Sequence, residues 1–118
     1  MHGHGGLDEI SPAGPTRVAR LEGGVVTEGQ IEPGDFGLAE APLEGLAGGD
    51  AAENARLVRA VLAGEAGARR SAVLINAAAA LAIAGVERDL RAARERAEAA
   101  IDSGAAGRLL QAWAGWGR

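Results

Sequence analysis

The sequence predicts an α/β fold in which one β-hairpin is followed by about four helices. Residues 1–49 are rich in glycine and proline and hold short β-prone pieces, whereas residues 50–118 are rich in alanine and carry apolar residues at helical spacing. The hydrophobic fraction of 47% is that of a globular protein. Because aromatic residues make up only 3%, the core has to be built from Ala, Leu, Val and Ile. A chain of 118 residues is long enough for one domain.

The hairpin is predicted from an alternating pattern. Residues 16–21 alternate polar and apolar side chains, residues 22–24 supply a glycine turn, and residues 25–31 return as the second strand. A two-stranded ribbon is marginally stable in water by itself, so we expect its partner strands upstream of this chain.

A loop over residues 32–49 connects the hairpin to the helical part, and we expect it to pack through Phe36, Leu38 and Leu43. The first helix should begin at Asp50, whose side chain caps the backbone while Glu53 reaches back from the third helical position. Its expected apolar stripe is Leu57, Val58, Val61 and Leu62, and Gly64 ends it.

Three more helices are expected. The second, over residues 71–84, is apolar on all sides, which predicts burial against more than one neighbour. The third, over residues 86–102, should place charged side chains such as Arg91, Arg94 and Glu95 on a solvated face, and the fourth should begin at Ala105. The expected inward residues of the third helix are Val86, Leu90, Ala93, Ala97 and Ile101, and the fourth helix carries Leu109, Leu110 and Trp113.

Composition excludes several classes of function. The net charge of −4 and the isoelectric point near 5.1 argue against a nucleic-acid surface. The chain has no cysteine, which excludes disulfides, zinc-thiolate sites and a thiol nucleophile and fits a reducing cytoplasm. No segment reaches the roughly 20 apolar residues that span a bilayer, and the longest, residues 72–84, is interrupted by Asn76. We therefore expect neither a nucleic-acid partner nor a membrane partner.

The best candidate site is the pair Asp8 and Glu9, two adjacent carboxylates that follow a glycine-rich run. A flexible turn of this kind can aim anionic oxygens at a cation or a polar ligand. Taken from spacing alone, the commoner alternative is a solvated acidic turn. Almost no chain precedes this turn, so we expect the sequence to be the tail of a larger enzyme.

Other polar residues have structural explanations. His2 and His4 make an incomplete transition-metal site, because the chain has no third histidine and no cysteine. Asn76, and Asn54 in the same way, are expected to be amides hydrogen-bonded by neighbouring backbone rather than ligand contacts. Arg69 and Arg70 could attract a phosphate, but a cation pair in an exposed turn is usually solvated. Trp113 and Trp116 are expected to cover a helix seam rather than to stack on a base.

A series of segments, in order, resembles one known family. They are His2-Gly3 with Gly6-Leu7-Asp8-Glu9, Gly14-Pro15-Thr16-Arg17-Val18, Pro33-Gly34-Asp35-Phe36-Gly37-Leu38, Gly48-Gly49-Asp50-Ala51-Ala52-Glu53-Asn54-Ala55, Val61-Leu62 with Gly64-Glu65, Val73-Leu74-Ile75-Asn76-Ala77-Ala78-Ala79-Ala80-Leu81, Ala84-Gly85 and Ala100-Ile101-Asp102-Ser103-Gly104-Ala105-Ala106. Their order and spacing resemble the C-terminal region of the anthranilate phosphoribosyltransferase family.

The resemblance implies a fold. Residues 1–118 would be the C-terminal fragment of the large α/β domain of a nucleoside phosphorylase/phosphoribosyltransferase-like fold. Residues 1–49 would hold the metal turn, the hairpin and the loop, and residues 50–118 the helical part.

The resemblance also implies a reaction of tryptophan biosynthesis, in which anthranilate attacks phosphoribosyl pyrophosphate and releases pyrophosphate. Asp8 and Glu9 would then hold Mg²⁺ near the donor pyrophosphate. The family's GTGGD donor loop is absent from this sequence, so we assign no catalytic or substrate-binding residue and expect the chain to be inactive alone. The missing N-terminal part of the same protein would be its partner, and the complete enzyme is expected to be a homodimer. The alternatives are a pyrimidine nucleoside phosphorylase-like protein and a non-catalytic homologue that acts as a binding module.

Overall fold

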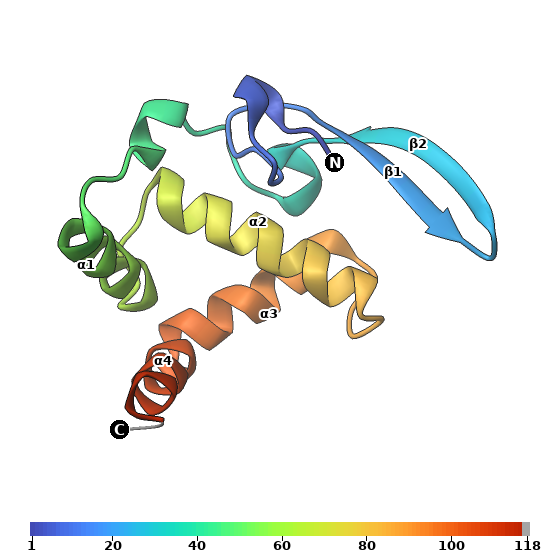
Figure 1. Ribbon diagram of the computed structural model, residues 1–118. Helices are drawn as coiled ribbons and strands as arrows, with labels where there is room; N and C mark the ends of the chain where they lie inside the picture. The colour runs from blue at the N-terminus through green and yellow to red at the C-terminus, as the bar shows by residue number, and fades with distance from the viewer. Residues whose placement is uncertain (117–118) are drawn as a thin grey trace.

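The computed structural model describes residues 1–116. In Figure 1 the hairpin projects to one side of a helical body, and α2 lies across the middle of that body, beside α3. In chain order the elements are η1 (His4–Gly6), β1 (Thr16–Glu22), β2 (Val25–Ile31), η2 (Pro33–Phe36), η3 (Leu43–Leu46), α1 (Ala51–Leu62), α2 (Ala68–Ile83), α3 (Leu90–Asp102) and α4 (Ala105–Gly115), where η marks a 3-10 helix.

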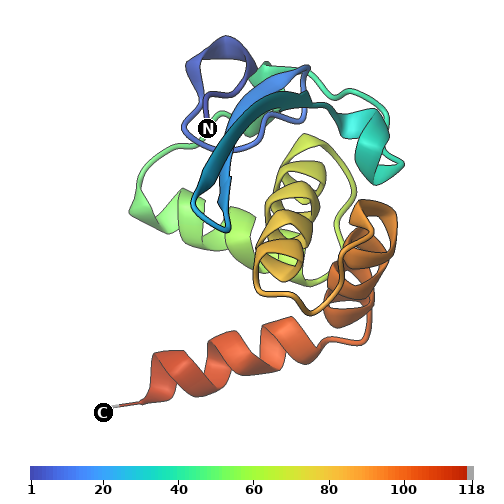
Figure 2. The same ribbon diagram turned by 90° about the vertical axis from the view of Figure 1, so that its right-hand side faces the viewer.

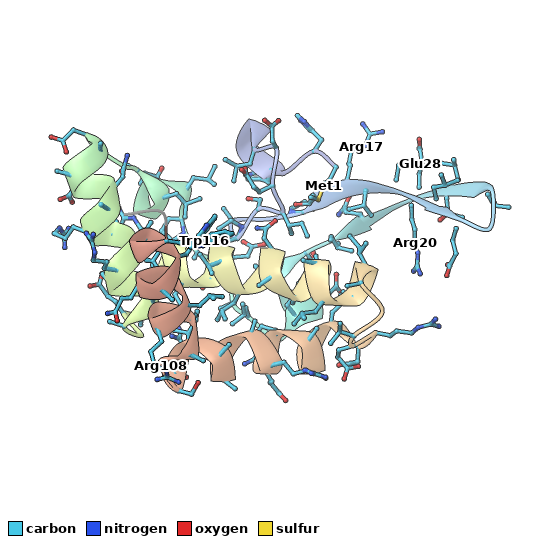
Figure 3. The ribbon with its side chains drawn as sticks, turned by 60° about the horizontal axis from the view of Figure 1, so that its bottom comes forward. Met1, Arg17, Arg20, Glu28, Arg108 and Trp116 are labelled. Atoms are coloured by element: carbon cyan, nitrogen blue, oxygen red, sulfur yellow. The ribbon has the colours of Figure 1, made fainter. Side chains whose placement is uncertain are left out.

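The predicted hairpin is confirmed. Strands β1 and β2 pair antiparallel from Thr16 opposite Ile31 to Glu22 opposite Val25. The two turn residues, Gly23 and Gly24, have φ of +56° and +81°, the left-handed backbone that a two-residue hairpin turn requires. Thr16 at the base is buried, whereas most of the ribbon is exposed on both faces. In Figure 3, Arg17 and Glu28 point from one face and Arg20 from the other, as this register dictates.

Helix α1 starts where the sequence predicted, but its cap differs. The Asp50 carboxylate accepts a hydrogen bond from the Glu53 backbone N–H at 2.8 Å, as expected. The Glu53 side chain does not reach back, because Arg56 donates to both of its oxygens, at 2.9 and 2.7 Å. The apolar stripe is also narrower than predicted, since Val58 is 50% exposed.

Helix α2 begins three residues before the predicted Ser71, because the Ser71 N–H bonds to the Gly67 carbonyl and residues 68–70 form the first turn. Leu74, Ile75 and Ala78 are buried. The prediction that this helix is buried against more than one neighbour is confirmed, because α2 packs on α3, η2 and η3. Its apolar surface is not covered all round, since Val73 is 42% and Ile83 86% exposed.

Helix α3 is shorter than predicted. The Asp89 side chain accepts from the Ala92 N–H at 2.8 Å and caps the helix there, which leaves Val86 outside it and 48% exposed. The predicted inward residues Ala93, Ala97 and Ile101 are buried. Arg94 does not lie on a solvated face, because it bonds to the Phe36 carbonyl at 3.2 Å and pairs with Glu98.

Helix α4 begins at Ala105, as predicted, but much of its apolar surface is uncovered. Leu109 and Trp113 are each 70% exposed and Trp116 is 86% exposed. The expectation that the two tryptophans cover a helix seam is therefore wrong for the described residues. Figure 2 shows α4 running out from the rest of the body.

Helix α2 joins the two halves of the core. One cluster joins its Ile75 and Ala78 to Ile10, Phe36 and Ala93, and a second joins its Leu74 to Val61, Ala97 and Ile101. The loop between hairpin and helices packs through fully buried Phe36, as predicted, and through half-buried Leu38 and Leu43. Within residues 1–116, no helix is long and apolar enough to cross a membrane.

Candidate functional site

The Asp8–Glu9 turn lies between η1 and a buried anchor. Both carboxylate residues are exposed, whereas the next residue, Ile10, is 1% exposed and belongs to the core. The two side chains therefore extend from a short segment whose downstream end is fixed by packing. The sequence predicted this exposed pair but not its anchor.

Gly3 packs against the backbone of the Asp8–Glu9 turn. Its N–H donates to the Leu7 carbonyl at 2.8 Å. A Cβ atom at Gly3 would come within 3.0 Å of the Glu9 carbonyl oxygen and to 3.1 Å from the Leu7 Cβ. The backbone of the turn therefore lies directly on Gly3, and glycine is the residue that allows this approach. In the sequence, Gly3 belongs to a glycine-rich run and to the His2-Gly3 pair of the resembling segment, and neither pattern predicts this contact.

Asn76 holds the downstream end of the turn. Its Oδ1 accepts from the Ile10 N–H at 3.0 Å, and its Nδ2 donates to the Ile10 carbonyl at 3.0 Å and to the Ala72 carbonyl at 2.9 Å. The expectation that backbone groups satisfy this amide is confirmed. The sequence did not predict that this partner is Ile10, which lies 66 residues away in the chain. The sequence signal for a hydrogen-bonding role was the presence of an amide inside an apolar helix.

The segment after Ile10 is equally constrained. The Thr16 hydroxyl accepts from the Ser11 N–H at 3.0 Å, and both residues are fully buried. The Pro12 carbonyl accepts from the Ala41 N–H at 2.8 Å. Beside the turn lies an open, mostly apolar groove of about 280 Å³, lined by Leu7, Glu9, Ile10, Pro12, Leu46, Ala72, Val73 and Asn76.

The turn fits Mg²⁺ only as part of a larger site. Among residues 1–116 no three His, Asp or Glu side chains converge into a metal cluster, and His2 and His4 complete none with Asp8 and Glu9. Mg²⁺ is typically held in proteins by one or two carboxylates, with waters and ligand phosphates as its other ligands. Two exposed carboxylates on a fixed turn match that donor set, so Asp8 and Glu9 remain the predicted ligands.

Arg69 and Arg70 do not form the exposed turn that the sequence suggested. They lie half-buried in the first turn of α2. Arg69 donates to the Ala47 carbonyl, and Arg70 donates to Asp102 at 2.7 Å and to Glu98 at 3.3 Å. The hydrogen bond to Asp102 raises the pKa of Arg70. Both guanidinium groups are therefore engaged in holding loop and helices together.

The chain matches one protein family over most of its length. The profile of the family described as "Glycosyl transferase family, a/b domain" matches residues 1–107. The chain is 54% identical over 113 residues to the anthranilate phosphoribosyltransferase of Myxococcus xanthus, covering 95% of this chain and 33% of that protein. It is 53% identical over 111 residues to that of Azospirillum brasilense, covering 94% and 31%. The chain thus spans about a third of the length of these curated relatives.

Solved structures agree. The anthranilate phosphoribosyltransferase of Saccharomyces cerevisiae in complex with PRPP and Mg matches with a TM-score of 0.82 and 33% identity, over 93% of this chain and 32% of that one. The enzyme of Thermus thermophilus matches with a TM-score of 0.81 and 34% identity, over 95% and 33%. The predicted α/β fold and the predicted resemblance are both confirmed.

Proposed function

Because this chain belongs to the glycosyl transferase family, whose a/b domain it matches over residues 1–107, we propose that it is the C-terminal third of an anthranilate phosphoribosyltransferase. The similarity to relatives of that name over 95% of the chain carries the proposal. The reaction transfers the phosphoribosyl group from phosphoribosyl pyrophosphate to the amino nitrogen of anthranilate. A homodimeric complete enzyme and a cytoplasmic location belong to the same proposal and rest on the resemblance alone.

Asp8 and Glu9 are the residues through which this third contributes to the chemistry. We propose that they hold Mg²⁺ at the donor pyrophosphate, where the ion would neutralise charge on the departing group. Support comes from two exposed carboxylates on a turn fixed at both ends, and from a structural relative solved with PRPP and Mg. The residues that bind anthranilate and the ribose belong, in this proposal, to the remaining two thirds.

The test is a chimera in which this chain replaces the matching third of the Myxococcus xanthus enzyme. We expect the chimera to form phosphoribosyl anthranilate in a Mg²⁺-dependent way, and the 118-residue chain alone to form none. Asp8→Asn/Glu9→Gln should raise the Mg²⁺ concentration for half-maximal turnover by more than about tenfold, because it removes two ligand charges while nearly preserving size.

The matched control removes two other charges. Glu28 and Glu40 are exposed carboxylates outside the turn, and Glu28→Gln/Glu40→Gln should leave the Mg²⁺ dependence unchanged. If the Asp8/Glu9 variant and the unmodified chimera had equal Mg²⁺ dependence, the pair would be a solvated acidic turn and not a metal ligand set. A chimera that forms no phosphoribosyl anthranilate at any Mg²⁺ concentration would contradict the assignment of this chain to that enzyme.

A further inference from the structure

We propose that Asn76 is a positioning residue for the metal turn, holding through Ile10 the backbone that carries Asp8 and Glu9. Its side-chain amide pairs with both backbone groups of Ile10, as described above, and Ile10 directly follows Glu9. This inference rests on the function proposed above, because it assigns Asn76 a role in the geometry of the proposed Mg²⁺ ligands.

The amide is well suited to this task. A side-chain amide carries an acceptor and two donors in one plane, so it can satisfy an N–H and a C=O of the same residue at once. The second Nδ2 bond, to the Ala72 carbonyl one turn earlier in α2, fixes the orientation of the amide. Helix α2 is itself anchored by buried Leu74, Ile75 and Ala78. The amide therefore ties the turn to the helix that joins both clusters of the core.

The contact between Asn76 and Ile10 lies directly next to the carboxylate pair along the chain. Gly3 supports the turn at Leu7 and Glu9, and Asn76 holds the next residue, so the chain is fixed on both sides of the carboxylate pair. A metal site loses affinity when its ligands are free to move, because fixing them then costs conformational entropy on binding. Loss of the Asn76 contacts would leave both backbone groups of Ile10, the residue next to Glu9, without their side-chain partner.

Asn54 provides an internal comparison. It makes the same reciprocal pair with one backbone residue, since Oδ1 accepts from the Gly49 N–H at 3.0 Å and Nδ2 donates to the Gly49 carbonyl at 3.0 Å. That pair closes a local loop of five residues at the start of α1, and carries no proposed ligand. Asn54→Ser and Asn76→Ser therefore remove equivalent hydrogen bonds, only one set of which supports the metal turn.

The experiment measures metal binding on the chimera described under the proposed function, with inorganic pyrophosphate present, because Mg²⁺ takes ligand phosphates in addition to one or two carboxylates. Mn²⁺, which shares the oxygen ligands of Mg²⁺, is titrated into isotopically labelled protein, and the paramagnetic broadening of the Asp8 and Glu9 amide signals gives its dissociation constant. We expect Asn76→Ser to raise that constant by about tenfold or more, as loss of an outer-shell partner does. Asn54→Ser should leave it unchanged. The serine hydroxyl can still bond to the Ala72 carbonyl, so α2 keeps that contact.

The experiment distinguishes failure of the positioning role of Asn76 from failure of the metal role of Asp8 and Glu9. Equal Mn²⁺ affinity of Asn76→Ser and the unmodified chimera would overturn the positioning role and leave the proposed metal ligands standing. No broadening at Asp8 and Glu9 in the unmodified chimera, or equal broadening in Asp8→Asn/Glu9→Gln, would overturn the metal role and the positioning role together.

A second measurement needs only the unmodified chimera with pyrophosphate, and decides the question if Asn76→Ser does not fold. Coupling between two events is reciprocal, so a contact that favours metal binding must itself be favoured by the metal. Saturating Mg²⁺ should therefore slow hydrogen exchange of the Ile10 N–H and of the Asn76 side-chain amide, and leave Gly49 and Asn54 unaffected. Unchanged exchange at Ile10 and Asn76 would overturn the proposal.

Discussion

A methyl group at Gly3 is expected to displace the Asp8–Glu9 turn and destabilise the protein. In Gly3→Ala the new Cβ would come within 3.0 Å of the Glu9 carbonyl oxygen, closer than real Cβ atoms approach backbone. The Leu7 Cβ and the Leu7 carbonyl oxygen would each lie 3.1 Å from the new Cβ, which is tighter than nearly all real Cβ contacts. Since the obstacles include backbone atoms, the clash cannot be relieved by rotating one flexible side chain.

The size of the effect follows from overpacking. Forcing extra carbon into a filled site typically costs about 1–3 kcal/mol. For a domain of this length each kcal/mol lowers the melting temperature by about 4 °C, so we expect a decrease of about 4–12 °C. The Leu7 and Glu9 amide signals should shift as well, because the turn has to move away from the new methyl group.

The assay compares thermal melts, followed by circular dichroism, with a matched substitution in β2. Gly29 has no atom within 4 Å of its would-be Cβ, so Gly29→Ala should keep or slightly raise the melting temperature. A melting temperature of Gly3→Ala equal to that of the wild type, together with unshifted Leu7 and Glu9 signals, would refute the close packing of the turn on Gly3.

Three further outcomes are expected. Arg70→Gln should cost about 1–3 kcal/mol of unfolding free energy in a denaturant titration, because the Arg70 side chain is only 12% exposed and joins α2 to two carboxylates of α3. Arg20→Gln, which removes the exposed pair with Glu22 in β1, should leave the midpoint nearly unchanged. The hydrogen bond from Arg56 holds the pKa of Glu53 below its ordinary value of 4.5, so the stabilisation from this ion pair is present above pH 4.5 and is lost as the pH falls through the lowered pKa. The difference in melting temperature between wild type and Glu53→Gln should therefore shrink in acid, and a difference that persists at the lowest pH would contradict this reasoning. The exposed Trp113 and Trp116 should fluoresce at long wavelength and be quenched by acrylamide, and the uncovered apolar surface of α4 should bind the dye 8-anilinonaphthalene-1-sulfonate. Blue-shifted, unquenched emission without dye binding would show that this surface is covered in solution.

Elements whose signals are local could be predicted from the sequence. The alternation of residues 16–21 and the glycine pair 23–24 determine the hairpin, because a period of two and a left-handed turn are properties of adjacent residues. The start of α1 was predicted for the same reason, since Asp50 caps a backbone N–H only three residues away. The carboxylate pair of the candidate site was found in the same way.

Elements that depend on distant partners could not be predicted. Val58 and Val86 fit a helical stripe in the sequence but are exposed, because burial depends on which neighbours are present. Arg94 was expected on a solvated face, yet it lies against the Phe36 carbonyl, 58 residues away in the chain. No local pattern contains information on such a partner.

The candidate site shows the same division. The sequence by itself determined that two carboxylates follow a glycine-rich run and that an amide interrupts an apolar helix. Only the three-dimensional structure decided that Gly3 lies against Glu9 and that Asn76 bonds to Ile10, because the first contact requires residues 3–9 to fold back on themselves and the second requires the N-terminal segment to pack on α2. Residue type sets which hydrogen bonds a side chain can make, but the packing of the helices decides which backbone group it meets.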